Sequence, residues 1–351
     1  MGTFNRGDIS EGILAAAIFA RFLSKKETIK EKHVLEVINS FPKPKKGTGN
    51  FKYIELSLQS PNKNIRIMDT VICKIALAPL NMDALVNKKI YSDKDIKGIV
   101  QASITYANSN HIKKWADMLY ENNQKNLIEV SSEGLFDQSG TKVDIRVKVD
   151  GKQCGVGVSL KYGDVKQFGQ VGGADIESMN TLFSPLGIKY SKKEEDDIEE
   201  YVMDKKIDKS MKLAYSLAQK QLNNIIKNDK IKFLKNLSNF INFHATRGEK
   251  DVVLVQLKGE ESHVYEFDNL DKKLKGINLN VEYTEGNTEV ISGAKIPQLR
   301  IMAENKEELL KIRCKLEGNR INSKGKRLPI TIRNYVEKGS LMEHLLSTTN
   351  K

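Results

Sequence analysis

Apolar and polar residues alternate most regularly near the middle of the chain. Apolar side chains occupy the four odd positions from Val143 to Val149, and polar ones occupy positions 144, 146 and 148. This period of two predicts a half-buried strand. Asp150-Gly151 then favours a tight hairpin turn, because both central residues of that turn need positive φ. We expect a second strand from about Gln153 to Lys161 and, after Gly163-Asp164, a helix that Asp164 caps and that begins near Val165.

Other patterns predict helices and strands on both sides of this hairpin. Residues 8–24 have a broad apolar face with several alanines, and Asp8 or Ser10 can cap that helix. The expected further helices are 28–39, 92–119 with a break near 108–110, 188–243, and 336–346. The expected further strands are 51–59, 126–131, 251–259, 263–267, 277–286, 297–302 and 310–317, while 65–80 fits either a short helix or a strand.

The chain is expected to be an α/β (α+β) protein. With 351 residues it can form one large or two modest domains. We divide it into a first core helix (1–24), a large, mostly helical insertion (25–124), a core hairpin with its following helix (125–185), a helical lobe (186–245), and a core-completing strand followed by a β-rich basic region (246–351).

Charge and cysteine content restrict the partners and the compartment. The net charge is +12, with a pI near 9.3, which favours a polyanion such as nucleic acid, although it would also suit an anionic membrane surface. No apolar run is long enough to span a bilayer, and the cations that follow ILAAAIFA do not fit a secretory signal. Three scattered cysteines suggest neither disulfides nor zinc. We therefore expect an intracellular, cytoplasmic protein with no membrane partner.

Candidate chemistry lies within the predicted hairpin. Ser159 and Lys161 are two residues apart on a strand, so their side chains point to the same face. The hairpin can bring Asp144 alongside them. A carboxylate supplies the hard oxygen ligand that Mg²⁺ prefers, and a lysine ammonium can act on a phosphate or on the attacking water.

This arrangement resembles the PD-(D/E)XK nuclease superfamily, in which an Asp on one hairpin strand is followed by an acid-x-Lys on the next. Val143-Asp144 matches the Pro-Asp of the motif with an apolar replacement, and Lys161 matches the lysine. Ser159 departs from the pattern, since the family usually has Glu or Asp there. The run SLKYGDVKQFGQ resembles phage-type members that carry serine at this position, and Glu11 corresponds to a further Glu that many members place on the first helix. The resemblance covers residues 7–22 and 126–173.

The resemblance implies a restriction-endonuclease-like αβββαβ core with a mixed sheet, and a DNA endonuclease that depends on Mg²⁺ or Mn²⁺. Asp144, Glu11 and the backbone carbonyl of Leu160 would bind the metal, and Lys161 would position the water. Ser159 could reach the metal only through water, which favours a single-metal site. Without the resemblance, Glu11 in the first helical turn could simply complement the helix dipole.

Two further groups of polar residues are candidates for contact with DNA. Gln167 and Gln170 fall on one face of the helix expected after Lys161, where they would orient a phosphate or a water, or would form an ordinary polar surface. The alternating segment 310–317 and the loop after it carry a basic stripe that suits the phosphate backbone. Its members are Lys311, Arg313, Lys315, Arg320, Lys324, Lys326, Arg327 and Arg333. A lysine-protected edge strand would produce the same pattern.

Three functional hypotheses follow. The first is the metal-dependent endonuclease. The second is a DNA-binding module on a nuclease scaffold, with Ser159 marking weakened catalysis. The third is a structural or interaction protein that uses its charged helical lobe. Under the first two hypotheses, this lobe would clamp DNA or form an oligomer contact, for example in a homodimer.

Overall fold

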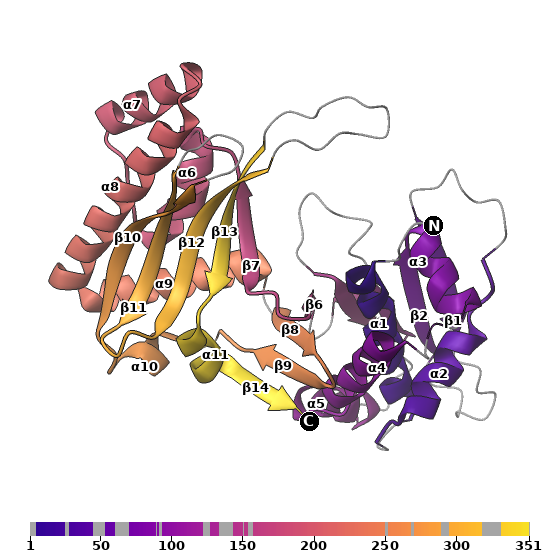
Figure 1. Cartoon of the computed structure of the whole chain (residues 1–351). Coiled ribbons are helices and arrows are strands. Elements are labelled where there is room, and N and C mark those ends of the chain that lie inside the picture. Colours follow the sequence, from indigo (N-terminus) through magenta and orange to yellow (C-terminus); the bar gives the residue numbers. More distant parts are fainter. Residues whose placement is uncertain are drawn as a thin grey trace. The chain divides into compact units, whose positions relative to one another are not determined.

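A computed structural model of the chain describes residues 5–24, 28–44, 53–59, 70–88, 90, 93–121, 127–132, 143–149, 151–153, 157–249, 252–267, 270–288, 295–317 and 331–350. It divides into two compact units. The first unit comprises residues 1–165, 249–266 and 348–351, and the second comprises residues 166–248 and 267–347. Figure 1 shows the elements of both units.

The first unit contains a mixed β-sheet. The strand order is β1 (Ile54–Gln59), β2 (Thr70–Leu77), β3 (Leu127–Ser132), β4 (Ile145–Val149), β6 (Gly157–Tyr162), β8 (Val252–Lys258), β9 (Glu261–Tyr265) and β14 (Ser347–Asn350), with β5 (Lys152–Gln153) paired to β4. The pairs β2/β3 and β6/β8 are parallel, whereas β3/β4, β4/β6 and β8/β9 are antiparallel. The hairpin signal is confirmed, since Val149 pairs with Lys152 and Gly151 has a φ of 77°.

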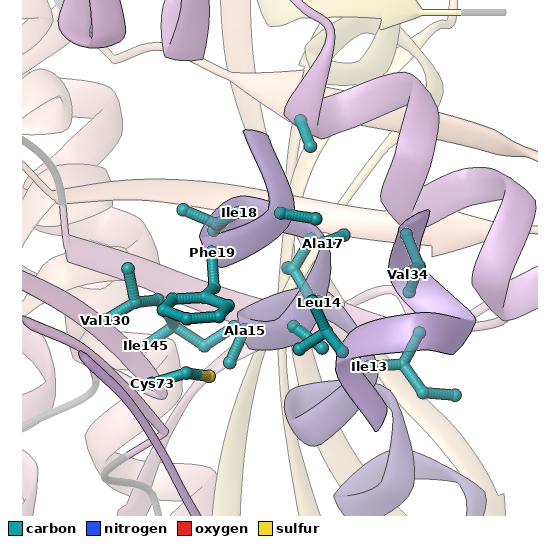
Figure 2. Close-up of a cluster of buried hydrophobic side chains, with 14 of the residues drawn as sticks. Ile13, Leu14, Ala15, Ala17, Ile18, Phe19, Val34, Cys73, Val130 and Ile145 are labelled. Atoms are coloured by element: carbon teal, nitrogen blue, oxygen red, sulfur yellow. The ribbon is translucent and has the colours of Figure 1, made fainter. Parts of the chain in front are cut away.

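The helices of this unit are α1 (Arg6–Leu23), α2 (Glu31–Ser40), α3 (Pro79–Met82), the π-helical turn Asp83–Asn87, α4 (Lys94–Ala107) and α5 (Asn110–Glu121). Helix α1 contacts α2 and α4 as well as strands β2, β3 and β6. The small alanine side chains of α1 allow it to pack closely against helices on one side and against the sheet on the other. Figure 2 shows Ala15 and Phe19 next to Cys73, Val130 and Ile145 of the sheet. Burial of such apolar side chains contributes about 1.5–3 kcal/mol each for the larger ones.

The second unit contains an antiparallel sheet in the order β10 (Leu279–Thr288), β11 (Lys295–Ala303), β12 (Glu308–Glu317), β13 (Thr331–Lys338) and β7 (Gln167–Gly172). Its helices are α6 (Ile176–Phe183), the 3₁₀ turn Ser184–Leu186, α7 (Lys192–Met203), α8 (Ile207–Asn228), α9 (Lys230–Thr246), α10 (Leu270–Leu274) and α11 (Ser340–Leu346). Helix α8 contacts β10 and β11, and α9 contacts β7, so both run along the sheet in Figure 1.

A buried polar link joins the helices to this sheet. The Tyr215 hydroxyl on α8 donates to Asn334 Oδ1 on β13 at 2.8 Å. The Asn334 amide donates in turn to the backbone carbonyls of Val171 and Gly173. These contacts satisfy groups that would otherwise be costly to bury, and they fix β7 beside β13.

The helix expected near Val165 is wrong. Residues 167–172 form β7, which pairs with β13, and Asp164 forms an ion pair with Lys258 at 2.6 Å instead of capping a helix. Gly169 helps to explain why this segment is a strand and not a helix. A Cβ atom there would lie 2.7 Å from the Cβ of His244 on α9, so this position needs glycine, which also has a low helix propensity. Tertiary pairing with β13 therefore decides the conformation.

Most of the other predicted elements are confirmed. The ambiguous segment 65–80 contains β2, and the pattern at 92–119 forms two helices separated at Asn108-Ser109. The expected helix 336–346 is only half right, because β13 continues to Lys338 and α11 begins at Ser340. No helix within the described ranges is both long and apolar enough to cross a membrane.

Candidate active site

Asp144 lies where the two central strands of the hairpin separate. It directly precedes β4, and its N–H donates to the Val158 carbonyl on β6 at 2.8 Å. Two residues later, the Leu160 N–H donates to Asp144 Oδ2. Residues two apart on a strand direct their backbone groups to the same side. The Asp144 carboxylate thus accepts the hydrogen bond of the buried Leu160 N–H, as a backbone carbonyl of a neighbouring strand would.

Lys161 approaches the same segment of backbone. Its Nζ donates to the Leu160 carbonyl oxygen at 3.0 Å. The Leu160 N–H and C=O are therefore engaged by the side chains of Asp144 and Lys161, respectively. This arrangement places a carboxylate, a carbonyl oxygen and an ammonium group together at the end of the β4/β6 pairing.

Glu11 is on the face of α1 that is turned to the sheet. It precedes Ala15 by four residues, and residues with that spacing share a helix face. Ala15 and Phe19 lie against Ile145 in Figure 2, and Ile145 is the neighbour of Asp144. By this spacing Glu11, which is partly buried, shares the helix face that carries Ala15.

The Glu11 carboxyl is affected by the charges of the other two residues. Burial raises the pKa of the Glu11 carboxyl well above its usual range, and the negative charges of Asp144 and Asp8 raise it further, whereas the Lys161 ammonium lowers it. Glu11 thus lies within range of the charges of the two other sequence-predicted residues, Asp144 and Lys161. Such a concentration of carboxylates in a poorly solvated place favours binding of a cation.

Asp8 belongs to this electrostatic group, although sequence reasoning gave it only a capping role. Burial raises the pKa of Asp8, while hydrogen bonds from the amides of Asn81 (2.7 Å) and Asn5 (3.0 Å) lower it. The cap of α1 is Asn5, which accepts from the Gly7 N–H. Asp8 and Glu11 are three residues apart, so they are neighbours on one face of the helix. This spacing is the sequence signal that indicates that Asp8 lies near Glu11.

Ser159 is buried, with 1% of its surface exposed, and its Oγ has no hydrogen-bond partner among the described residues. Leu160 and Val158 belong to the apolar cluster with α1, so Ser159, and Lys161 by the same alternation, start from the other face of the sheet. A hydroxyl is far less costly to bury than an unpaired carboxylate. Burial thus gives a physical reason for serine where the family pattern has an acid.

Gln167 and Gln170 are not on a helix, as expected, but on β7 of the second unit, whereas Glu11, Asp144 and Lys161 belong to the first. Gln167 Nε2 donates to Gln170 Oε1 at 3.0 Å. The predicted helix that gave the two glutamines a shared face is therefore wrong.

The basic stripe of segment 310–317 lies on β12. This strand pairs with β11 on one side and β13 on the other, so the edge-strand explanation is wrong. Lys311 and Arg313 approach Glu337 at 3.9 and 2.7 Å, and Arg333 pairs in register with the exposed Lys315. The remaining members of the stripe lie outside the described residues; they are Arg320, Lys324, Lys326 and Arg327.

The donors available to a metal ion are few. In the part of the chain that the structure describes, no group of three or more His, Cys, Asp or Glu side chains is arranged to hold a metal. Mg²⁺, however, is usually bound by only one or two carboxylates, with water and substrate phosphate completing its shell. Asp144 and Glu11, with the Leu160 carbonyl, fit that smaller requirement.

Comparisons with protein-family models, with curated proteins and with solved structures found no match to this chain.

Proposed function

We propose that the protein is a metal-dependent DNA endonuclease of the PD-(D/E)XK type. The observation that carries this proposal is the geometry at Leu160, whose backbone N–H donates to the Asp144 carboxylate and whose carbonyl oxygen accepts from the Lys161 ammonium. The charges of Asp144 and Lys161, which act on the Glu11 carboxyl from distant parts of the sequence, support it. Two carboxylates and a lysine at the divergence of a β-hairpin are the groups that the resemblance requires.

The order of the elements also supports the proposal. After α1, β1 and β2, the chain forms β3, β4 and β6, in which β4 pairs antiparallel with both β3 and β6. Strand β8 then pairs parallel to β6, after a segment that contains β7 and the helices α6 to α9. This order supports the restriction-endonuclease-like αβββαβ core that the resemblance implies. Strands β1 and β2, between α1 and β3, extend the same sheet.

Each residue of the group has a distinct chemical role in the proposal. Asp144 and Glu11 would hold Mg²⁺ or Mn²⁺ together with the Leu160 carbonyl oxygen. The ion, when bound, would stabilise the negative charge that develops on the scissile phosphate. Lys161 would orient the attacking water and neutralise part of the phosphate charge. Ser159 is buried and would not bind the ion directly.

The second unit offers cations for the DNA backbone. Lys311, Arg313 and Lys315 share the outer face of β12, and Arg333 is next to them on β13. Arg320, Lys324, Lys326 and Arg327 extend the set in the sequence. Each phosphate contact releases about one counterion, so we expect binding to weaken steeply as salt is raised.

Cleavage of supercoiled plasmid tests the proposal. The wild-type protein should nick or linearise the plasmid with Mg²⁺ or Mn²⁺ and should do nothing with EDTA. Asp144→Asn and Lys161→Met should not cut, whereas Lys275→Met, at an exposed position of the second unit, should cut as wild type does. Cleavage at the wild-type rate by Asp144→Asn would exclude the assigned role.

One observation favours the second hypothesis, a nuclease-fold module that binds DNA with weakened catalysis. The buried Ser159 stands at the position where the nuclease pattern has an acid. In addition, no set of three metal-ligating side chains is present among the described residues. The same plasmid experiment separates the two functions. A salt-sensitive gel shift without any metal-dependent cutting would identify the protein as a binding module.

A further inference from the structure

One face of the second sheet carries the helices, and the other carries charged and amide side chains. Leu310, Ile312 and Cys314 of β12 are buried on the helix side, so Lys311, Arg313 and Lys315 project from the opposite, outer face. Strand register extends this outer face to neighbouring strands. It adds Arg300 and Gln298 of β11, Tyr335 and Arg333 of β13, and Gln170 of β7.

The cation at the centre of the outer face is held in a fixed position. The Arg313 guanidinium lies 5.2 Å from the centre of the Tyr335 ring. Its Nε and Nη2 both contact Glu337 Oε1, at 2.8 and 2.7 Å. A guanidinium fixed in this way keeps a planar surface, and such planes stack with unpaired nucleobases. Among the side chains of this face that the structure describes, five cations are accompanied by the carboxylates of Glu282, Glu308 and Glu337.

A cavity of about 590 Å³ lies at the end of this row, where β7, β13, the start of α6 and the junction of α7 and α8 meet. Its apolar wall comes from Val202, Ile207 and Ile332. Gly172 is one of the residues that line the cavity. A Cβ atom built there would have only the Ile332 carbonyl oxygen nearby, at 3.8 Å.

The polar lining of the cavity combines three kinds of group. Arg333 supplies a cation, Gln170 an amide, and Asp175 a carboxylate, one oxygen of which caps α6 through the Ser178 N–H. A cation suits a phosphate, whereas an amide and a carboxylate suit the donor edge of a base. A carboxylate disfavours a site for phosphate alone or for an anionic lipid headgroup. The apolar wall suits the faces of a planar ring.

We propose that this cavity accepts one unpaired nucleotide of a nucleic-acid strand that runs along the outer face of the second sheet. Arg333 contacts its phosphate, Gln170 and Asp175 contact its base, and Arg313 stacks with a neighbouring base. The protein therefore prefers single-stranded over double-stranded nucleic acid, because a base in a duplex must first be unpaired and unstacked before it can enter. This inference depends on the second unit alone and is independent of catalysis.

The test is fluorescence anisotropy of labelled single-stranded and duplex oligodeoxynucleotides with the full chain in EDTA, which prevents metal-dependent cleavage. Gly172→Val adds a branched side chain to the wall of the cavity and leaves every charge in place. We expect it to weaken single-strand binding by about tenfold, the order of magnitude for one seated base, and to reduce the preference over duplex. Gly276→Val, where a Cβ atom meets nothing within 4 Å, is the matched control and should bind as wild type does.

A second variant keeps the test decisive if Gly172→Val does not fold, which thermal unfolding will show. Arg333→Gln should weaken single-strand binding and lower the slope of log K against log salt by about one contact. Equal affinity of the wild type for single strand and duplex, or wild-type binding by both variants, would overturn the proposal. So would binding to anionic vesicles without binding to oligonucleotides. Loss of plasmid cleavage alone bears on Asp144 and Lys161, not on this cavity.

Discussion

The Asp144 carboxylate accepts a hydrogen bond from the backbone N–H of Leu160, at the point where β4 and β6 separate. The adjacent residue of β4, Ile145, still pairs with Val158 of β6. The side chain of Asp144 therefore continues the contact between strands after the backbone pairing has ended. Its structural role and its proposed role as a metal ligand can be separated by substitution.

Asp144→Asn and Asp144→Ala should both abolish cleavage but differ in stability. Asparagine keeps an oxygen that can accept from the Leu160 N–H, whereas alanine leaves this buried donor without its partner. We expect alanine to lower the free energy of unfolding by about 1–3 kcal/mol more than asparagine. Urea denaturation and plasmid cleavage measure the two effects. Equal stability of the two variants would show that the hydrogen bond contributes nothing.

Glu11→Gln should stabilise the protein at neutral pH. A carboxyl whose pKa is raised on folding binds its proton more tightly in the folded state, so its contribution is full below the unfolded pKa of about 4.3 and is lost as pH rises through the folded pKa. Glutamine mimics the protonated carboxyl. The variant should therefore have a higher Tm than wild type near pH 7 and the same Tm in acid.

The control for this pH dependence is Glu36→Gln, at an exposed position on α2. Mg²⁺ provides a second readout, because an ion bound by Glu11 stabilises only the folded state. It should raise the Tm of the wild type and not that of Glu11→Gln. A gain in Tm for Glu11→Gln that is the same at every pH would contradict the electrostatic explanation.

Ser159→Ala should leave cleavage intact and raise the free energy of unfolding by about 1 kcal/mol, because it removes a buried hydroxyl that has no partner among the described residues. Ser210→Ala is the matched control. Ser210 is equally buried, but its Oγ donates to the Ala174 carbonyl at 2.9 Å, so its loss should destabilise the protein. Loss of cleavage in Ser159→Ala would indicate a catalytic role for the hydroxyl.

Gly157→Ala should disturb the hairpin that carries Asp144. A Cβ atom at position 157 would lie 2.8 Å from a methyl carbon of Val143 and 3.1 Å from one of Val252. We expect a loss of about 1–3 kcal/mol in the free energy of unfolding, the usual effect of overpacking, together with slower cleavage. Gly276→Ala, in open space, should change neither quantity.

Arg313→Lys should weaken binding to single-stranded DNA while keeping the salt dependence. Lysine retains the charge but lacks the planar guanidinium that lies on Tyr335 and forms two contacts with Glu337. In a plot of log K against log salt concentration, this variant should give a line that is parallel to that of the wild type and lies below it. Lys315→Arg, at an exposed position of the same strand, should not lower the affinity. A change of slope without a change of affinity in Arg313→Lys would contradict the stacking role.

Local sequence patterns were sufficient for the elements around the candidate site. Alternation from Val143 to Val149, the glycine at 151 and the alanine-rich face of residues 8–24 predicted β4, the turn and α1, because each reflects the period or the backbone freedom of a single element. The same patterns gave the buried face of β12 and the identity of its three projecting cations.

Tertiary structure decided where those elements pair and which side chains meet. Residues 167–172 became a strand because β13 supplies hydrogen-bond partners and α9 leaves room only for glycine at 169, and neither is visible in the local pattern. The group of Glu11, Asp144 and Lys161 likewise depends on the contact of α1 with the sheet. The sequence alone determined the periodicity, the charges and the turns, since these arise from neighbouring residues. Only folding determined the burial of Ser159, the inclusion of Asp8 and the cavity beside Arg333, because these arise from contacts between residues far apart in the chain.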